Sequence, residues 1–296
     1  MKIAVFTKNR ANPAYVAARL GADRAAAELG AEVAHYVPER PDDPVQQSAL
    51  IAQALRERPD AVVLVPVHPQ AVNAAIRAIN AAGIPLVSTI NRLAEGRSVC
   101  FVGSEDTPLA FDIARYLFER MGGEGSVAII EGPAESITSI ARVRAFRDAA
   151  SRFPGIRIVA TCCGDYGAEP ARKAVAALLA VTPELDAILA ANDIMAIGAI
   201  DALQAAGRSA LLAGVNAIPE AIKAIKAGRM VATTDFNAMN MAYLATQCAV
   251  RHVRGEPVPA EIILPVQIVD RANCDLWDLP YELRRCPAWS EVTRSN

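Results

Sequence analysis

Polar and aromatic side chains stand directly after many of the short apolar runs in this chain, where they could hold a ligand. Amide, guanidinium and carboxylate groups suit a ligand rich in hydroxyl groups, because a hydroxyl both donates and accepts hydrogen bonds. Tyrosine rings can cover the apolar C–H face of a sugar, so the set indicates a neutral polyhydroxylated ligand. In chain order the candidates are Lys8, Asn9, Asn12, Tyr15, Asn91, Arg92, Thr138, Tyr166, Asn192, Asn216 and Asp235.

The same residue types also have an ordinary structural use. Asn and Asp after a strand often form turns or cap the next helix, and Pro13 makes the stretch 7–15 the entry to a helix. We expect Asp193 to cap the helix that follows it. Because such residues follow one strand after another and share one expected edge, a ligand site is favoured over a series of unrelated turns.

The apolar runs alternate with Ala- and Leu-rich segments of helical periodicity, such as residues 15–30, which Gly30 closes as a C-terminal cap. Many runs are continuously apolar, which is typical of strands in a parallel sheet covered by helices on both faces. The sequence therefore predicts an α/β fold of doubly wound parallel sheets. The candidate strands are too many for one comfortable sheet, so we expect two. Ligands of such sheets bind outside the carboxyl ends of the strands.

The chain divides into two expected lobes and an extension. We assign residues 1–104 and 236–269 to an N-terminal lobe and 105–235 to a C-terminal lobe, with 262–269 as a single strand. Residues 270–296 hold both tryptophans and two of the six cysteines. This density predicts an ordered extension packed on a lobe or near the hinge.

The composition excludes several classes of protein. Hydrophobic residues make up 53% and charged residues 21% of the 296 residues, which is typical of a soluble globular protein. The net charge is −2 without a basic block, so we expect no nucleic-acid partner. No C-x-x-C pair occurs and only three histidines are present, so we expect no metal site. Cys274 and Cys286 could pair in an oxidising compartment.

The beginning of the chain leaves two locations open. No apolar run is long enough to span a bilayer, and Met1 and Lys2 lead directly into a strand without a leader sequence. The chain then represents either a mature periplasmic protein recorded without its leader, which we expect, or a cytosolic protein.

Signatures of the common enzymes on this fold class are missing. No G-x-G-x-x-G follows the first strand, and neither a G-x-S-x-G elbow nor a Walker loop occurs. His35 falls within a strand and His252 on a late helix, and His68 has no nucleophile or metal partner nearby in the sequence. We therefore expect a protein that is not an enzyme and that needs no cofactor.

Six segments carry a resemblance to a known family: ANPAY (11–15), AGIPLVSTINR (82–92), GEGSVAIIEG (123–132), ARVRAF (141–146), LDAILAANDIMAIGAIDALQAAG (185–207) and GVNAIPEAIKAIKAGRMVATT (214–234). With them the chain resembles the type I periplasmic solute-binding proteins of the ribose and galactose class, whose fold is shared with the effector-binding domains of LacI-type repressors. The resemblance covers about residues 2–269. It implies two lobes joined by three hinge crossings, which close on one sugar in the cleft between them.

The resemblance also implies which residues contact the ligand. The chain departs from the ribose type at Ala14-Tyr15, where an aromatic pair is expected, and at Ile140, where an arginine is expected. Asn91 and Asn216 replace carboxylates, and Asp235 replaces an amide. Our hypothesis is therefore a pentose, a polyol or another small sugar derivative. The positions that match the family's contacts are Asn12, Tyr15, Asn91, Arg92, Tyr166, Asn192, Asn216 and Asp235.

The leading hypothesis is a solute-binding protein that delivers its sugar or polyol to the membrane subunits of an ABC importer and is itself a monomer. The second is a ligand sensor for a membrane receptor or regulator; a repressor is disfavoured, because no DNA-binding headpiece precedes the first strand. A variant of the first takes a furanosyl ligand of the autoinducer-2 type, with which Lys8 is compatible.

Overall fold

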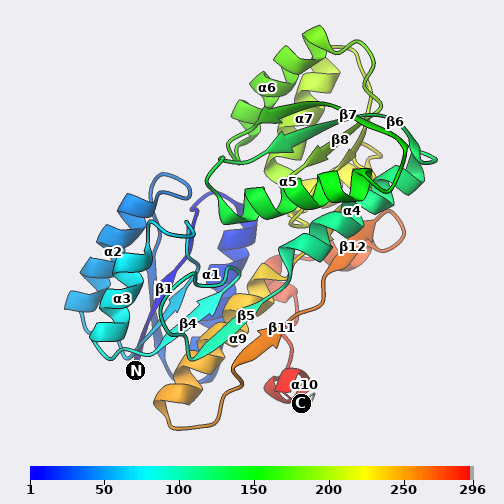
Figure 1. Ribbon diagram of the computed structural model, residues 1–296. Helices are drawn as coiled ribbons and strands as arrows, with labels where there is room; N and C mark the ends of the chain where they lie inside the picture. The colour runs from blue at the N-terminus through cyan, green and yellow to red at the C-terminus, as the bar shows by residue number, and fades with distance from the viewer. Residues whose placement is uncertain (294–296) are drawn as a thin grey trace. The chain divides into compact units, whose positions relative to one another are not determined.

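The computed structural model describes residues 1–293, and these form two compact units (Figure 1). Within the described residues each unit has one six-stranded sheet, and strands alternate with helices along the chain. The predicted α/β class with two doubly wound lobes is thereby confirmed. The first unit consists of Met1–Ser104, Asn237–Pro265 and the chain from Pro280 on, and the second of Glu105–Phe236 and Val266–Leu279.

The elements of the first unit are β1 Lys2–Phe6, α1 Pro13–Glu28, β2 Glu32–Tyr36, α2 Pro44–Arg56, β3 Ala61–Leu64, α3 Asn73–Ala81, β4 Leu86–Thr89, β5 Cys100–Gly103, α9 Ala238–Val253, β11 Glu261–Ile263, the 3₁₀ helix η2 Tyr281–Leu283 and α10 Trp289–Thr293. All pairings in this sheet are parallel, in the order β11-β5-β4-β3-β1-β2. Figure 1 shows α2 and α3 on one side of the sheet and α1 and α9 on the other. The central strands β3, β4 and β5 are buried throughout, because helices cover both of their faces.

Helices α1 and α9 pack closely because α1 presents small residues to its neighbour. Ala18 and Ala22 are fully buried. A Cβ atom at Gly21 would lie 2.1 Å from the carbonyl oxygen of Met239 on α9, so only glycine fits at this position. The contact fixes α1, whose N-terminal end carries several of the candidate ligand-binding residues.

The elements of the second unit are α4 Asp106–Arg120, β6 Glu124–Glu131, α5 Ile137–Ala150, β7 Gly155–Cys163, α6 Ala168–Val181, β8 Ala187–Ala190, α7 Asp193–Ala205, β9 Leu211–Ala213, α8 Pro219–Lys226, β10 Ala232–Asp235, β12 Gln267–Asp270 and the 3₁₀ helix η1 Cys274–Trp277. The strand order is β12-β10-β9-β8-β6-β7. Only β12 runs antiparallel to its neighbour among the described strands. Helix α4 packs with α5, and α7 packs with both α6 and α8.

The run 262–269, expected as one strand of the N-terminal lobe, is two strands in different units. β11 pairs with β5 of the first unit, whereas β12 pairs with β10 of the second. Pro265 lies between them and has no N–H to donate, so it adds no ladder hydrogen bond at the point where the chain leaves the first sheet. Residues 266–269 therefore belong to the second unit, which corrects the predicted boundary.

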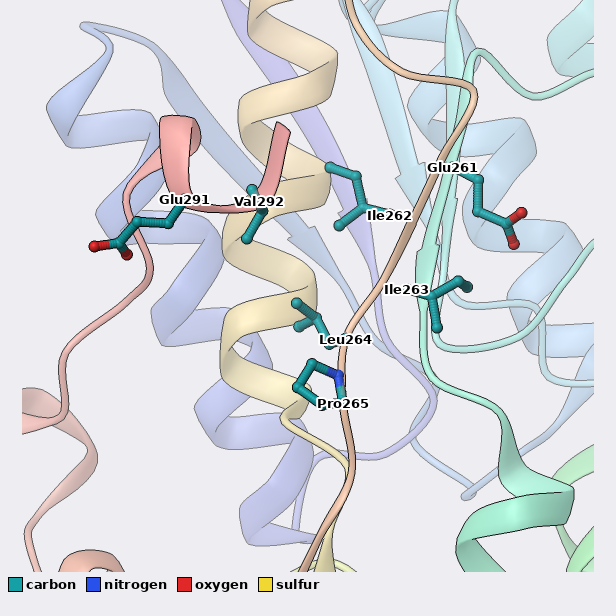
Figure 2. Close-up of a pocket in the computed structure, with 7 residues that line it drawn as sticks. All are labelled: Glu261, Ile262, Ile263, Leu264, Pro265, Glu291 and Val292. Carbon is teal, nitrogen blue, oxygen red and sulfur yellow. The ribbon is translucent and has the colours of Figure 1, made fainter. Parts of the chain in front are cut away.

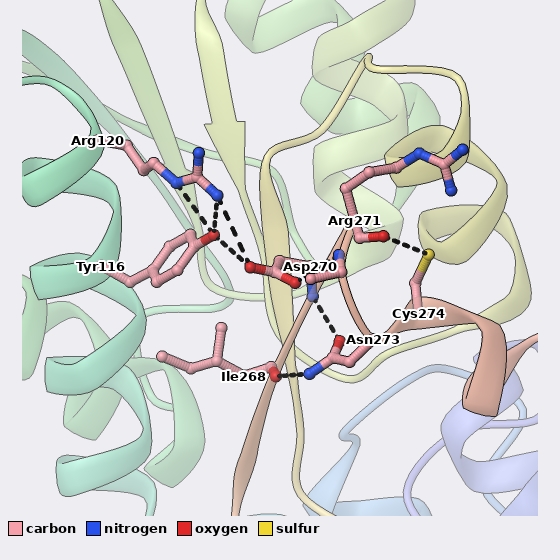
Figure 3. A network of polar contacts seen from close by, with 8 residues as sticks. Tyr116, Arg120, Ile268, Asp270, Arg271, Asn273 and Cys274 are labelled. Atoms are coloured by element: carbon pink, nitrogen blue, oxygen red, sulfur yellow. Dashed lines mark hydrogen bonds and ion pairs between the residues drawn. The ribbon is translucent and has the colours of Figure 1, made fainter.

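A polar network fixes the turn from β12 into the extension (Figure 3). The Tyr116 hydroxyl donates to Asp270 Oδ2 at 2.6 Å, and the Arg120 guanidinium donates to the Tyr116 oxygen at 2.7 Å. The hydrogen bond from Tyr116 holds the pKa of Asp270 below its ordinary value. On the other side of the turn, Asn273 Nδ2 donates to the Ile268 carbonyl at 2.9 Å. The chain therefore leaves the sheet in one defined direction.

The extension is ordered over its described residues, and its parts pack on different units. In the second unit Cys274 is fully buried and η1 lies against α8. In the first unit the Arg24 guanidinium donates to the carbonyls of Arg284 and Glu282 at 2.6 and 2.9 Å. Cys274 and Cys286 are both free thiols, so the pairing considered from the sequence is not present.

Within residues 1–293 the chain passes from one unit to the other four times, after Ser104, Phe236, Pro265 and Leu279. Three of these passages correspond to the hinge crossings expected from the sequence, and the fourth lies in the extension. No helix in the described part of the chain is both long and apolar enough to cross a bilayer.

We predict that Gly21→Ala destabilises the first unit although alanine is the better helix former. The added methyl group collides with the α9 backbone, and overpacking of this kind costs about 1–3 kcal/mol, which exceeds the helix-propensity gain of about 1 kcal/mol. Urea denaturation measures the effect. Val16→Ala, a change at an exposed position of the same helix, is the control and should differ little from wild type.

Candidate functional site

The strand order of each sheet locates the place where a ligand would bind. In the first unit β1 lies between β2 and β3, and in the second β6 lies between β7 and β8. The winding of the chain reverses at β1/β3 and at β6/β8, and ligands of open α/β sheets bind outside the carboxyl ends at such points. The candidate residues follow these strands and their neighbours in both units.

In the first unit, the loop after β1 is held by its own polar groups. Asn9 Oδ1 accepts hydrogen bonds from the backbone N–H groups of Ala11 and Asn12 at 2.8 and 2.9 Å. Asn12 is the N-cap of α1, and its Oδ1 accepts from Ala14 N at 3.0 Å. Arg19 closes the loop from α1 by donating to the Asn9 carbonyl at 2.9 Å. Both amides therefore stabilise the loop and the start of α1. In Asn12 the side-chain oxygen makes the cap, so the side-chain nitrogen is the candidate group for a ligand.

Lys8 is a buried cation with a buried partner. Its side chain is 1% exposed, and its Nζ lies 3.4 Å from Asp42 Oδ1 in the segment between β2 and α2. A buried ammonium group needs such a counter-charge, because its desolvation is otherwise too costly. The sequence did not indicate Asp42, since it lies more than thirty residues from Lys8 in a stretch without a motif. Tyr15 is also buried, on the first turn of α1.

Asn91 and Arg92 follow β4 but lie in different surroundings. Ile90 has a φ of 65°, which is unusual for a β-branched residue and turns the chain sharply. Asn91 is then buried, and its Nδ2 donates to the Pro66 carbonyl at 3.0 Å after β3. The Arg92 side chain is 52% exposed, pairs with Glu261 and stacks 4.1 Å over the Phe101 ring. Both residues were predicted to contact the ligand, and the structure buries only Asn91.

In the second unit, Tyr166 rests on the end of β6. Asp165 and Tyr166 both have positive φ values, 49° and 54°. A Cβ atom at Gly132 would lie 2.4 Å from the Tyr166 ring, so a glycine is required where the ring crosses the backbone. The Tyr166 hydroxyl lies 3.3 Å from Ser136 Oγ. Thr138, on the first turn of α5, is buried as well.

Arg142 is the main residue that sequence reasoning missed. Ile140, which stands where the resemblance led us to expect an arginine, is 53% exposed, whereas Arg142 is 3% exposed. Its Nε donates to Asp106 Oδ1 at 2.9 Å and its Nη1 to the Ala191 carbonyl at 2.7 Å. The same Nη1 lies 3.4 Å from Asn216 Oδ1. The sequence could have indicated Arg142, because it lies four residues after the candidate Thr138. Residues at this spacing share one face of a helix.

Asn192, and not Asp193 as expected, caps the helix α7. Its Oδ1 accepts from Met195 N at 2.9 Å. Asp193 is fully buried and accepts from the Thr233 hydroxyl at 2.7 Å and from Ile218 N at 3.1 Å. Asp193 thus links the start of α7 to β10 and to the start of α8. Asn192 is buried at the end of β8, and its amide nitrogen remains a candidate ligand contact.

Asn216 lies in the loop after β9, and Asp235 is the last residue of the adjacent strand β10. Asn216 has a φ of 125°, and Ala217 after it has 51°, so the backbone is strained where the Asn216 amide approaches Arg142. Asp235 Oδ2 accepts a hydrogen bond from Trp277 Nε1 at 2.7 Å. The sequence gave no indication of this last contact, because Trp277 is forty-two residues away in the extension.

One further pocket lies in the first unit, with a volume of about 420 Å³ (Figure 2). It is lined by Glu261, Ile262, Ile263, Leu264, Pro265, Glu291 and Val292, from the edge strand β11 and from α10. None of the eleven candidate residues is part of this lining. Among residues 1–293, no three His, Cys, Asp or Glu side chains are grouped in a way that could hold a metal ion.

Residues 3–257 match the family model described as the periplasmic binding protein domain, so the chain belongs to that family. It is similar to the "D-ribose/D-allose-binding protein" of Pseudomonas aeruginosa, with 30% identity over 239 residues, 77% of this chain and 75% of the relative. It is also 26% identical over 267 residues to the "Ribose import binding protein RbsB" of Bacillus subtilis, which covers 90% of this chain and 85% of the relative.

A solved structure agrees with these relatives. The ABC transporter periplasmic solute binding protein from Actinobacillus succinogenes 130z, solved with bound D-allose, superposes with a TM-score of 0.87 at 27% identity. The match covers 93% of this chain and 99% of that one. The resemblance inferred from the sequence segments is thereby confirmed.

Asp193 predicts a pH dependence of stability. Burial raises the pKa of this carboxyl from its ordinary 3.8 to about 7. The folded state therefore holds its proton more tightly than the unfolded state, so its stabilising contribution is complete below about pH 4 and is lost as the pH rises to about 7. The stability of wild type relative to Asp193→Asn should fall by up to about 4 kcal/mol over that range.

Urea denaturation at several pH values measures this difference. Asp201→Asn, which changes an exposed carboxylate of the same helix, is the matched control and should follow wild type at every pH. A constant difference between wild type and Asp193→Asn from pH 4 to 7 would contradict the assignment.

Proposed function

We propose that this protein captures a small sugar or polyol and delivers it to an ABC importer. The family is one of binding proteins, and two of its relatives are named for ribose or allose. The polar sets at the strand ends of both units support the same class of solute. A further role as a sensor has no specific observation in its favour.

The arrangement around Arg142 carries the proposal. Its guanidinium is buried, fixed by Asp106 and the Ala191 carbonyl, and aimed at the Asn216 amide beside the ring of Phe236, 5.5 Å from the ring centroid. Planar guanidinium donors with adjacent amides suit vicinal hydroxyl groups, and a nearby ring suits the C–H face of a sugar. These groups are held by the protein itself, so a solute would meet them already oriented.

The charge arrangement favours a neutral solute. Lys8 is paired with Asp42, and Arg142 with Asp106, so each buried cation near the strand ends has a carboxylate from the same unit. An anionic solute would have to compete with these carboxylates. A solute rich in hydroxyl groups can instead bind through donors and acceptors without changing the charge balance. Because Lys8 is buried and paired with Asp42, it no longer favours an autoinducer-2-type ligand.

We propose further that the sets of the two units bind one and the same solute. Each set supplies amides and one tyrosine ring. A solute held by both favours the closed form of a two-lobed protein and shifts the population toward it. The membrane subunits of the importer would then recognise that form. No chemical step on the solute is required.

A thermal-shift screen against pentoses, hexoses, pentitols and inositols tests the proposal. A solute present at one hundred times its dissociation constant should stabilise the protein by about 2.7 kcal/mol. Asn192→Asp should abolish the shift while the unliganded protein stays folded, because the carboxylate keeps the cap of α7 but has no amide N–H to donate.

The matched control is Asn80→Asp, the same change at an amide of α3 that bonds the backbone of Arg97 and is not a candidate contact. It should keep the full shift. A response to amino acids, with none to any sugar or polyol, would overturn the proposal.

A further inference from the structure

The extension makes a direct contact with a candidate ligand-binding residue. Trp277 Nε1 donates a hydrogen bond to Asp235 Oδ2 at 2.7 Å, and both residues belong to the second unit. A hydrogen bond to a carboxylate is stronger than one between neutral groups, so it favours one orientation of the Asp235 carboxylate. A carboxylate has about four lone-pair sites, so the indole N–H does not by itself use up its capacity to accept hydrogen bonds.

Several contacts hold Trp277 in this position. Cys274, at the start of η1, is fully buried. Lys226 at the end of α8 contacts Asp275 Oδ1 and Asp278 Oδ2, each at 2.6 Å, so carboxylates on both sides of Trp277 share one ammonium group. These two partners raise the pKa of Lys226, which therefore stays charged. The Trp277 indole thus belongs to a segment that contacts the second unit at Cys274, Asp275 and Asp278.

The same segment also contacts helix α8. Helix α8, which ends at Lys226, is the helix that follows Asn216, and Asn216 lies in the loop between β9 and α8. The extension therefore contacts Asp235 through Trp277 and also contacts the C-terminal end of α8 through Lys226. The matched family region ends at residue 257, so residues 271–278 lie outside it.

We propose that Trp277 is a positioning residue for Asp235, and that residues 271–278 thereby help determine which sugar or polyol the protein prefers. This inference rests on the proposed function. Asp235 would accept from one or two solute hydroxyls whose stereochemistry matches the orientation that Trp277 imposes. Without the indole N–H the carboxylate would rotate, and solutes that differ only at those hydroxyls would be distinguished less well.

Trp277→Phe in the full-length chain tests the inference, because it keeps an aromatic ring and removes only the N–H donor. Titration calorimetry with the preferred solute and with its epimers should show an affinity lower by about tenfold or more for the preferred solute, and a smaller ratio between epimers. In Asp235→Asn the same Trp277→Phe change should have little further effect, since the two residues act as a unit.

Trp289→Phe is the matched control, because Trp289 is the other tryptophan and packs on Arg251 in the first unit. It should keep both the affinity and the epimer ratio. If Trp277→Phe lowers the melting temperature but leaves the epimer ratio unchanged, Trp277 is only a packing residue and the inference is wrong.

The hydrogen bond itself is tested without any solute. The indole N–H proton signal of Trp277, assigned with Trp277→Phe, should move in Asp235→Asn, and that of Trp289 should not. An unmoved Trp277 signal overturns the inference whatever solute is found. Wild-type protein that binds no sugar or polyol, with the expected indole shift present, overturns the proposed function instead.

Discussion

The structure depends on one constraint: a polar side chain that is buried at the end of a strand must have a partner within the protein. Lys8 meets this constraint through Asp42, Arg142 through Asp106, and Asp193 through Thr233 and a backbone N–H. Each partner comes from a different element, so the pairings tie separate strand ends and helix starts together. The polar groups at the strand ends of each sheet are therefore held by the protein before a ligand arrives, which lowers the cost of binding.

The same constraint explains why several candidate residues have two uses. Asn12 and Asn192 each cap a helix with the amide oxygen and keep the amide nitrogen for another partner. A capping residue has its side chain at the N-terminal end of a helix, and in these sheets that end lies beside the carboxyl end of a strand. Structural and binding roles are therefore compatible in one side chain. A capping role for Asn12 or Asn192 therefore does not argue against a binding role for the same residue.

The fold could be predicted because the strand, helix and turn patterns of the sequence all agree with it. Continuous apolar strands, alternating helices and helix-ending glycines all indicate two parallel sheets. The run 262–269 was misjudged because its apolar residues are continuous and only Pro265 reveals the break. The candidate residues could be proposed from the sequence as a set of positions, since strand ends share an edge, and their role in binding stays a prediction. Its pairings could not, because Asp42 and Trp277 reach their partners from distant segments that carry no periodic signal.

We propose that the polar sets of both units bind one solute. Titration calorimetry of the unmodified protein with the solute found by screening measures this, together with Asn12→Asp in the first unit and Asn192→Asp in the second, since each change keeps the cap oxygen and removes the amide N–H. We expect one binding event per chain and its loss in either variant. Two independent binding events, or a variant in one unit that leaves binding intact, would contradict it.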